Sequence, residues 1–229
     1  MKNVEKFSEK EICYALFGTI LGDSWVKNYK TTAWIKISHT EKQKEYVNFF
    51  KNLADVWGLK STKIYQYVQE TNYGTYKYYS CNIKLPTKRH FGLERTYKDG
   101  KKIVSPYVLN RISVFGLLLW YLDDGSLTVH TKKNGSVSRS GSIATHSFTY
   151  NENLAIQRMF KDRFDIDVSV NRDKTYNYIY INAENFRKFI DIVRPYLKLV
   201  PKDMMYKFNM KYVKNRLKDS ELLVANYNF

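Results

Sequence analysis

Two stretches of sequence decide the fold of this chain: Leu16-Phe17-Gly18-Thr19-Ile20-Leu21-Gly22-Asp23-Ser24 and Leu117-Leu118-Leu119-Trp120-Tyr121-Leu122-Asp123-Asp124-Gly125. Each is an apolar run with helical spacing that stops abruptly at an acid. They predict two buried helices, each with a carboxylate at its C-terminal end.

The surrounding sequence repeats the same order of elements. In the first half, hydrophobic periodicity predicts helices at 11–21 and 41–57 and strands at 25–30, 33–39, 62–69 and 75–85. In the second half it predicts helices at 113–122, 151–164 and 183–196 and strands at 126–131, 139–147, 166–172 and 176–182. Both halves therefore follow the order helix, hairpin, helix, hairpin, helix. We expect an N-terminal half at 1–95, a linker at 96–111, a C-terminal half at 112–210 and a terminal helix and tail at 211–229.

The overall composition excludes several classes of protein. The 229 residues are 44% hydrophobic, enough for a packed core, and no apolar run approaches the roughly 18 residues of a membrane span. No secretory signal pattern is present, and Cys13 and Cys81 lack metal-binding spacing. We expect an intracellular protein of an organelle, a phage-infected cell or a bacterial cytoplasm, not a secreted one.

A formal net charge of +16 indicates a polyanionic partner. The basic residues are interleaved with Tyr, Thr, Asn and Trp in strand-like segments, which is typical of a structured binding surface. A soluble basic protein without such a partner is the alternative.

Asp23 and Asp124 occupy matched places in the repeat. If the halves pack with pseudo-two-fold symmetry, the leading helices can lie side by side, and Gly18 and Gly22 on one helix face allow close approach. The two acids then meet at helix C-termini, which already carry partial negative charge, so a divalent cation such as Mg²⁺ would stabilise the pair. The alternative is that Gly-Asp and Asp-Asp-Gly are only turn residues.

The two stretches resemble the paired motifs of the monomeric, intron-encoded LAGLIDADG homing endonucleases. The eighth motif position, the metal-binding acid of the family, falls on Asp23 and Asp124. The third position is Gly18 in the first copy and Leu119 in the second, and the seventh is Gly22 and Asp123. Leu119 and Asp123 are bulkier than is usual there, which argues against equally close helix packing. We include Gly22 and Asp123 among the candidate metal contacts. The role of Asp123 stays open: it could be a secondary ligand, a capping group or a packing compromise.

The likeness extends over roughly residues 12–208, through Thr145-His146-Ser147-Phe148-Thr149, Ile179-Tyr180-Ile181, Arg194-Pro195-Tyr196-Leu197 and Met204-Met205-Tyr206-Lys207. It implies an α+β fold of two αββαββα halves that form a DNA-binding saddle. It also implies a monomeric, Mg²⁺- or Mn²⁺-dependent endonuclease that cuts both strands of a long, asymmetric DNA site, leaves 3′ overhangs and serves intron mobility. Two alternatives stay open: an RNA-binding maturase that acts on intron RNA, and a DNA-binding regulator without cleavage.

Further candidates lie near the acids. His39 and His146 each end a strand before a helix and could position water or phosphate, or could belong to N-capping segments with Thr40 and Thr149. By the resemblance, Lys207 and either Lys101 or Lys102 would stabilise developing charge. Between these two linker lysines the sequence does not decide, and we list Lys102 as the candidate.

The four predicted hairpins carry basic residues that would contact DNA, and together two sheets would span about 16 to 20 base pairs. The candidates are Lys27, Lys30, Lys36, Lys63, Lys77, Lys84, Lys132, Lys133, Arg139, Arg172 and Lys174.

Overall fold

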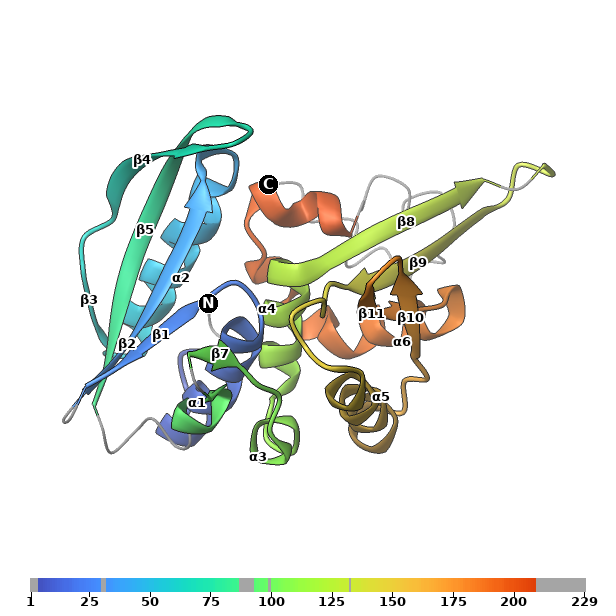
Figure 1. The fold of residues 1–229 in the computed structure, drawn as a ribbon, viewed down its shortest axis with the longest axis horizontal. Coiled ribbons are helices and arrows are strands. Elements are labelled where there is room, and N and C mark those ends of the chain that lie inside the picture. Colours follow the sequence, from blue (N-terminus) through green and yellow to red (C-terminus); the bar gives the residue numbers. More distant parts are fainter. Residues whose placement is uncertain (1–3, 30–31, 87–92, 99, 132, 209–229) are drawn as a thin grey trace.

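Two antiparallel sheets, each backed by helices, lie on either side of a central pair of helices, α1 and α4 (Figure 1). The computed structural model describes residues 4–29, 32–86, 93–98, 100–131 and 133–208. The predicted α+β fold with two related halves is confirmed. The segment at 211–229, expected as a helix and tail, lies outside the described residues.

The N-terminal half contains α1 (Glu9–Leu21), β1 (Trp25–Asn28), β2 (Thr32–Thr40), η1 (Glu41–Gln43), α2 (Lys44–Val56), β3 (Lys60–Ser61), β4 (Tyr65–Thr71) and β5 (Gly74–Pro86). Its sheet has the order β1-β2-β5-β3, with β4 also paired to β5. Helix α1 begins in a capping box: the Ser8 side chain accepts from the Glu11 amide, and the Glu11 carboxylate accepts from the Ser8 amide. Along β2, Ala33, Ile35, Ile37 and His39 are buried, while the alternate residues face the open side of the sheet.

The C-terminal half repeats this plan with α4 (Val114–Asp124), β8 (Gly125–Thr131), β9 (Val137–Ile143), α5 (Tyr150–Phe164), β10 (Ser169–Asp173), β11 (Tyr176–Ile181) and α6 (Ala183–Val193). Its sheet order is β10-β11-β9-β8. The 3₁₀ segments η4 (Arg194–Leu199) and η5 (Lys202–Lys207) follow α6.

Two strands of this half are shorter than the sequence predicts. Strand β9 ends at Ile143 rather than at residue 147, because the buried Thr145 hydroxyl bonds to Asn153 of α5 and Thr149 caps that helix. Strand β10 begins at Ser169 rather than at residue 166, because Ile166 is buried and its amide still bonds to the Phe160 carbonyl of α5.

The connection between the halves contains η3 (Leu93–Thr96), the small hairpin β6 (Tyr97–Lys98) and β7 (Lys101–Lys102), and α3 (Pro106–Leu109). The repeat predicts a helix equivalent to α6 between β5 and α4. Among the described residues of this segment, the structure has these short elements instead. Gly100, with φ of +76°, lies in the turn between β6 and β7.

Helices α1 and α4 run side by side in the same direction. At the start of α4, the Ser113 amide donates to the Tyr14 carbonyl of α1 at 3.1 Å. Further along, a Cβ added to Gly18 would lie 2.5 Å from the carbonyl carbon of Gly116, so the absence of both side chains sets the separation of the helices. The expectation of looser packing was therefore wrong: Gly116, three residues before Leu119, supplies the small residue opposite Gly18.

The seventh motif positions are complementary in the same way. A Cβ added to Gly22 would lie 2.5 Å from the Cβ of Asp123. The missing side chain in the first copy thus makes the space that the larger side chain of the second copy fills. Within the part of the chain that the structure describes, we find no helix with the length and apolar character needed to span a membrane.

Candidate active site

Asp23 and Asp124 lie at the C-terminal ends of the two central helices. Asp23 is exposed and follows Gly22, the C-cap of α1, while Asp124 is the last residue of α4 and is partly buried. Burial and the negative charge of Asp23 raise the pKa of Asp124 to about 7. The Trp120 indole donates to the Asp124 carboxylate at 3.2 Å. The fold therefore brings together the two acids that the sequence selected, in a place where carbonyl dipoles also repel negative charge.

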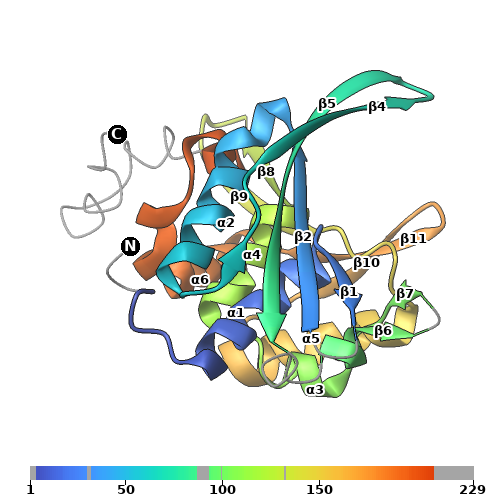
Figure 2. The same ribbon diagram turned by 90° about the vertical axis from the view of Figure 1, so that its left-hand side faces the viewer.

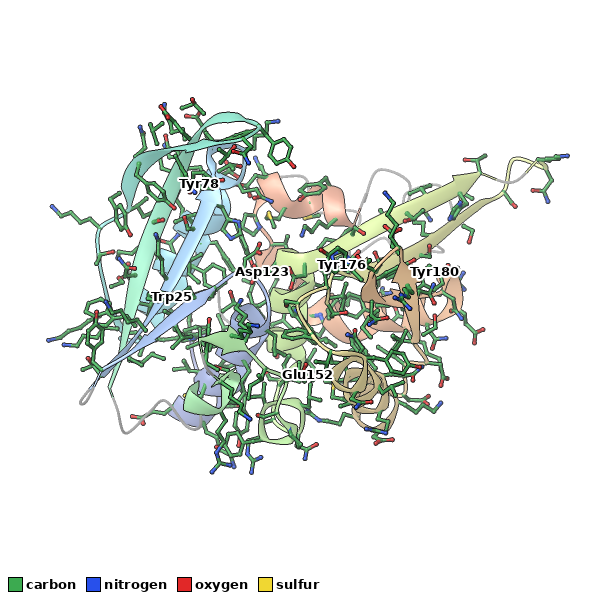
Figure 3. The ribbon with its side chains drawn as sticks, in the orientation of Figure 1. Trp25, Tyr78, Asp123, Glu152, Tyr176 and Tyr180 are labelled. Atoms are coloured by element: carbon green, nitrogen blue, oxygen red, sulfur yellow. The ribbon has the colours of Figure 1, made fainter. Side chains whose placement is uncertain are left out.

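Asp123 is the buried acid of the site, between the two sheets (Figure 3). Its Oδ1 accepts from the Tyr46 hydroxyl at 2.6 Å, and its Oδ2 accepts from the Thr19 hydroxyl at 2.8 Å and from the Asp23 amide at 3.2 Å. Burial, and then the charge of Asp23, raises the pKa of Asp123 well above its usual range. Its side chain thus ties α4 to α1 and to α2, and holds the backbone of Asp23.

Two lysines approach the site in matching ways. The Lys207 ammonium donates to the Asp123 carbonyl at 2.7 Å, and the Lys102 ammonium donates to the Gly22 carbonyl. Burial lowers the pKa of both lysines, and the neighbouring carboxylates oppose that effect. Lys101, on the same short strand, is exposed. The structure therefore places Lys102, not Lys101, beside the acids, and the Gly22 carbonyl already serves as an acceptor there.

The two histidines lie in different surroundings. His39, in β2, is 6% exposed, and its ring lies 5.0 Å from that of Tyr46. Potential ligand atoms of Asp23, His39 and Asp123 all lie within 4.8 Å of one another. His146 lies beyond the end of β9, is exposed, and packs against Tyr176 at 5.6 Å between ring centres. Of the N-cap residues considered, Thr149 caps α5, whereas Thr40 makes no capping hydrogen bond.

Sequence reasoning missed Thr19, Tyr46, Trp120 and Gln43. Trp120 could have been found, because it lies four residues before Asp124 on the same face of α4 and donates to it. Thr19 lies four residues before Asp23, but its hydroxyl donates to Asp123 of the other helix. Tyr46 lies among the apolar residues of the helix predicted at 41–57, and only the tertiary structure shows its hydroxyl directed at Asp123.

The open face of the N-terminal sheet carries three of the basic candidates, Lys27, Lys36 and Lys84. The hairpins β4–β5 and β10–β11 project to the same side of the molecule, away from α2 and α6 (Figure 2). Lys36 and Lys84 lie on the open face of the N-terminal sheet, over the rings of Tyr67 and Trp34 at 4.8 and 5.8 Å. The same face holds a shallow pocket of about 240 Å³ lined by Trp25, Lys27, Tyr29, Trp34, Lys36, Thr62 and Asn82.

The remaining basic candidates are mostly at the surface. Lys63, Lys133, Arg172 and Lys174 are exposed, as is Lys77, which pairs with Glu41 at 3.5 Å. Arg139 is partly buried. Lys30 and Lys132 lie outside the described residues.

Comparison with known proteins identifies relatives over most of the chain. The sequence model of the LAGLIDADG DNA endonuclease family matches residues 13–189. A probable intron-encoded endonuclease of Wickerhamomyces canadensis is 26% identical over 84% of this chain and 81% of its own length. A cytochrome b mRNA maturase, bI2, of Debaryomyces hansenii is 23% identical over 90% of this chain and 76% of its own length.

The fold also matches a solved structure. The homing endonuclease I-WcaI, bound to its DNA recognition sequence, superposes with a TM-score of 0.69 over 90% of each chain, at 21% sequence identity. The likeness supports the fold, with its two halves and central helix pair.

Proposed function

The chain belongs to the LAGLIDADG DNA endonuclease family, and from this premise we propose that it is a homing endonuclease that breaks both strands of a long, asymmetric DNA site. The observation that carries the proposal is the meeting of Asp23 and Asp124 at the ends of the two packed helices. Each acid would serve one strand. Because the two copies differ at Gly22 and Asp123, we expect the two halves of the target to differ as well.

The donor set fits a hard divalent cation. Asp23 and Asp124 offer carboxylate oxygens, which Mg²⁺ prefers, and Mn²⁺ is compatible with the same ligands. Burial, and then the negative charge of Asp23, raises the pKa of Asp124, and a bound cation would oppose that shift by stabilising the ionised carboxylate. When bound, such ions lower the pKa of water and neutralise charge on a phosphodiester.

The protein's own groups would position the reacting atoms. Asp123 holds the Asp23 amide, so the exposed carboxylate starts from a fixed backbone. Lys102 and Lys207 hold the Gly22 and Asp123 carbonyls and place two ammonium groups beside the acids. We propose that both stabilise the negative charge that develops at each scissile phosphate. The products would carry 5′-phosphate and 3′-hydroxyl ends, with short 3′ overhangs.

The open sheet faces would bind the duplex. Lys and Arg can contact phosphates and guanine, and β-ribbons fit the major groove. With about eight phosphate contacts, affinity should fall by about 10³ to 10⁵ between about 50 and 200 mM salt. We propose that Lys27, Lys36 and Lys84 on the N-terminal sheet take part.

The test is cleavage of a randomised duplex library with Mg²⁺ or with EDTA. We expect linear products with defined ends that depend on Mg²⁺ and share a consensus of about 16 to 20 base pairs. If no metal-dependent product with a shared sequence appears, the proposal is wrong.

A second candidate function is assistance of intron splicing. The observation in its favour is the similarity to the Debaryomyces hansenii maturase over 90% of this chain. In that case the purified protein would bind the RNA of its host intron and accelerate its splicing. This function is compatible with DNA cleavage, so each needs its own assay.

A further inference from the structure

His39 is a buried imidazole directed at the acids. It is the last of the buried residues of β2, and its exposed fraction is 6%. A ligand atom of His39 lies within 4.8 Å of oxygens of both Asp23 and Asp123.

A chain of hydrogen bonds orients the ring. The Gln43 amide nitrogen donates to the Tyr206 hydroxyl at 3.3 Å, which leaves the Gln43 amide oxygen facing His39. That oxygen lies 3.2 Å from His39 Nδ1, so Nδ1 carries the proton and Nε2 keeps its lone pair. No second hydrogen bond to this ring occurs among the described residues. An imidazole that donates through one nitrogen to a fixed acceptor, with the other nitrogen free, has the arrangement of a metal ligand.

Asp123 can share a ligand sphere with His39. Once a bound cation has displaced its proton, the Asp123 carboxylate has about four acceptor sites, of which three accept from Tyr46, Thr19 and the Asp23 amide. One site on Oδ1 therefore remains. Around a first-row ion, ligand atoms at about 2.0–2.2 Å from the metal lie about 3 Å from one another. Rotation of the exposed Asp23 side chain can shorten the distances from its carboxylate oxygens to His39 and to Asp123, which lie within 4.8 Å.

The equivalent place in the second half has no such group. His146 matches His39 in the repeat, but it is exposed and packs against Tyr176. In the part of the chain that the structure describes, Asp124 belongs to no comparable group with a nitrogen donor.

We propose that His39 is a nitrogen ligand in the Asp23 half of the site, which gives that half alone a preference for first-row transition ions such as Co²⁺, Ni²⁺ or Zn²⁺ over Mg²⁺. Imidazole binds such ions well, whereas Mg²⁺ prefers oxygen ligands. This inference rests on the proposed function, because it takes Asp23 as a metal ligand. It makes the two metal positions chemically unequal.

The test measures binding and does not use cleavage. Metal-stripped full-length protein is titrated with Co²⁺ and, separately, with Mg²⁺, and binding is followed by calorimetry and by the visible absorption of Co²⁺. We expect His39→Gln to weaken Co²⁺ binding at least about tenfold and to change Mg²⁺ binding less than about twofold. His146→Gln is the matched control and should bind both ions as the wild type does.

A second measurement covers the case in which His39→Gln fails to fold. Wild-type protein labelled with ¹⁵N-histidine is loaded with Mn²⁺ and examined by pulsed electron paramagnetic resonance, where a ligating imidazole gives a ¹⁵N coupling. Equal Co²⁺ affinity in folded His39→Gln and wild type, or the absence of any ¹⁵N coupling, would overturn the inference. Mg²⁺-dependent cleavage of library DNA would still stand in that case, so failure of this inference can be told from failure of the proposed function.

Discussion

The contact between Gly18 and Gly116 predicts that Gly18→Ala will strongly destabilise the protein. The added Cβ would lie 2.5 Å from the Gly116 carbonyl carbon, whereas ordinary contacts begin near 3.4 Å. The nearest obstacle is the Gly116 carbonyl oxygen, which lies closer still and belongs to the backbone, so the helices must separate by more than about 1 Å along a crossing that also carries the site. Overpacking of this kind costs about 3 kcal/mol or more, and the helix propensity of Ala returns about 1 kcal/mol.

The expected net loss is therefore about 2 kcal/mol or more in the free energy of unfolding. For a domain of this size that corresponds to a fall in Tm of about 4–8 °C. The assay is thermal and urea unfolding followed by circular dichroism. Gly116→Ala should also destabilise, because its Cβ would lie 2.6 Å from the Tyr14 carbonyl oxygen. Asn48→Ala, on the exposed side of α2, is the control and should change stability by less than about 0.5 kcal/mol. If Gly18→Ala is as stable as that control, the two helices do not touch as described.

Three further predictions follow from the site and the sheets. Tyr46→Phe leaves the Asp123 carboxylate without its 2.6 Å donor and should lower the free energy of unfolding by about 1.5–3 kcal/mol in urea titrations; no loss would mean that this bond does not hold the acid. In metal-free protein, the folded-state pKa of Asp124 is about 7, against about 3.8 for an aspartate in an unfolded chain, so the folded state binds the extra proton. This group should therefore reduce stability as pH rises from about 4 to 7, by about 4 kcal/mol at most. Buried His39 acts in the opposite direction over part of that range, and Asp123, whose pKa is also raised, acts in the same direction. The comparison is therefore with Asp124→Asn, whose stability should fall less steeply as pH rises; parallel curves would contradict the assignment. Lys36→Ala should reduce the slope of log affinity against log salt by about 0.9 for DNA, while Lys161→Ala, on α5 and paired with acids, should leave it unchanged; equal slopes would remove Lys36 from the interface.

The sequence was sufficient to predict the order of the helices and strands, because the local hydrophobic patterns of these elements agree with the tertiary packing. The apolar runs before Asp23 and Asp124 form α1 and α4, and the alternation in β2 matches one buried and one open face. The repeat then places the two acids at equivalent positions. Strand ends were less predictable, since Thr145 and Ile166 leave the sheet through bonds to α5, a neighbour that no local pattern reveals.

The site was predictable as a pair of acids but not as a network. Motif position identified Gly18, and the bulkier Leu119 and Asp123 at the matching positions of the second copy argued against equally close packing. The close approach depends instead on Gly116, a residue outside the motif. Likewise, the matched histidines are equivalent in sequence, yet only His39 is buried beside the acids, because strand β2 continues through it whereas β9 ends before His146. Such differences depend on contacts between elements, which a single sequence does not encode in its local pattern.

The most direct test of the central claim is plasmid cleavage by single-acid variants. A selected target site is carried on a supercoiled plasmid, and wild type, Asp23→Asn and Asp124→Asn are compared with Mg²⁺, with DNA binding measured in parallel by gel shift in EDTA. The two acids would share one metal site, and each would serve one strand of the DNA. Both variants should therefore bind the target about as well as wild type and fail to produce linear DNA. Linear product at the wild-type rate from either variant would contradict the account, because that acid would then not take part in the chemistry.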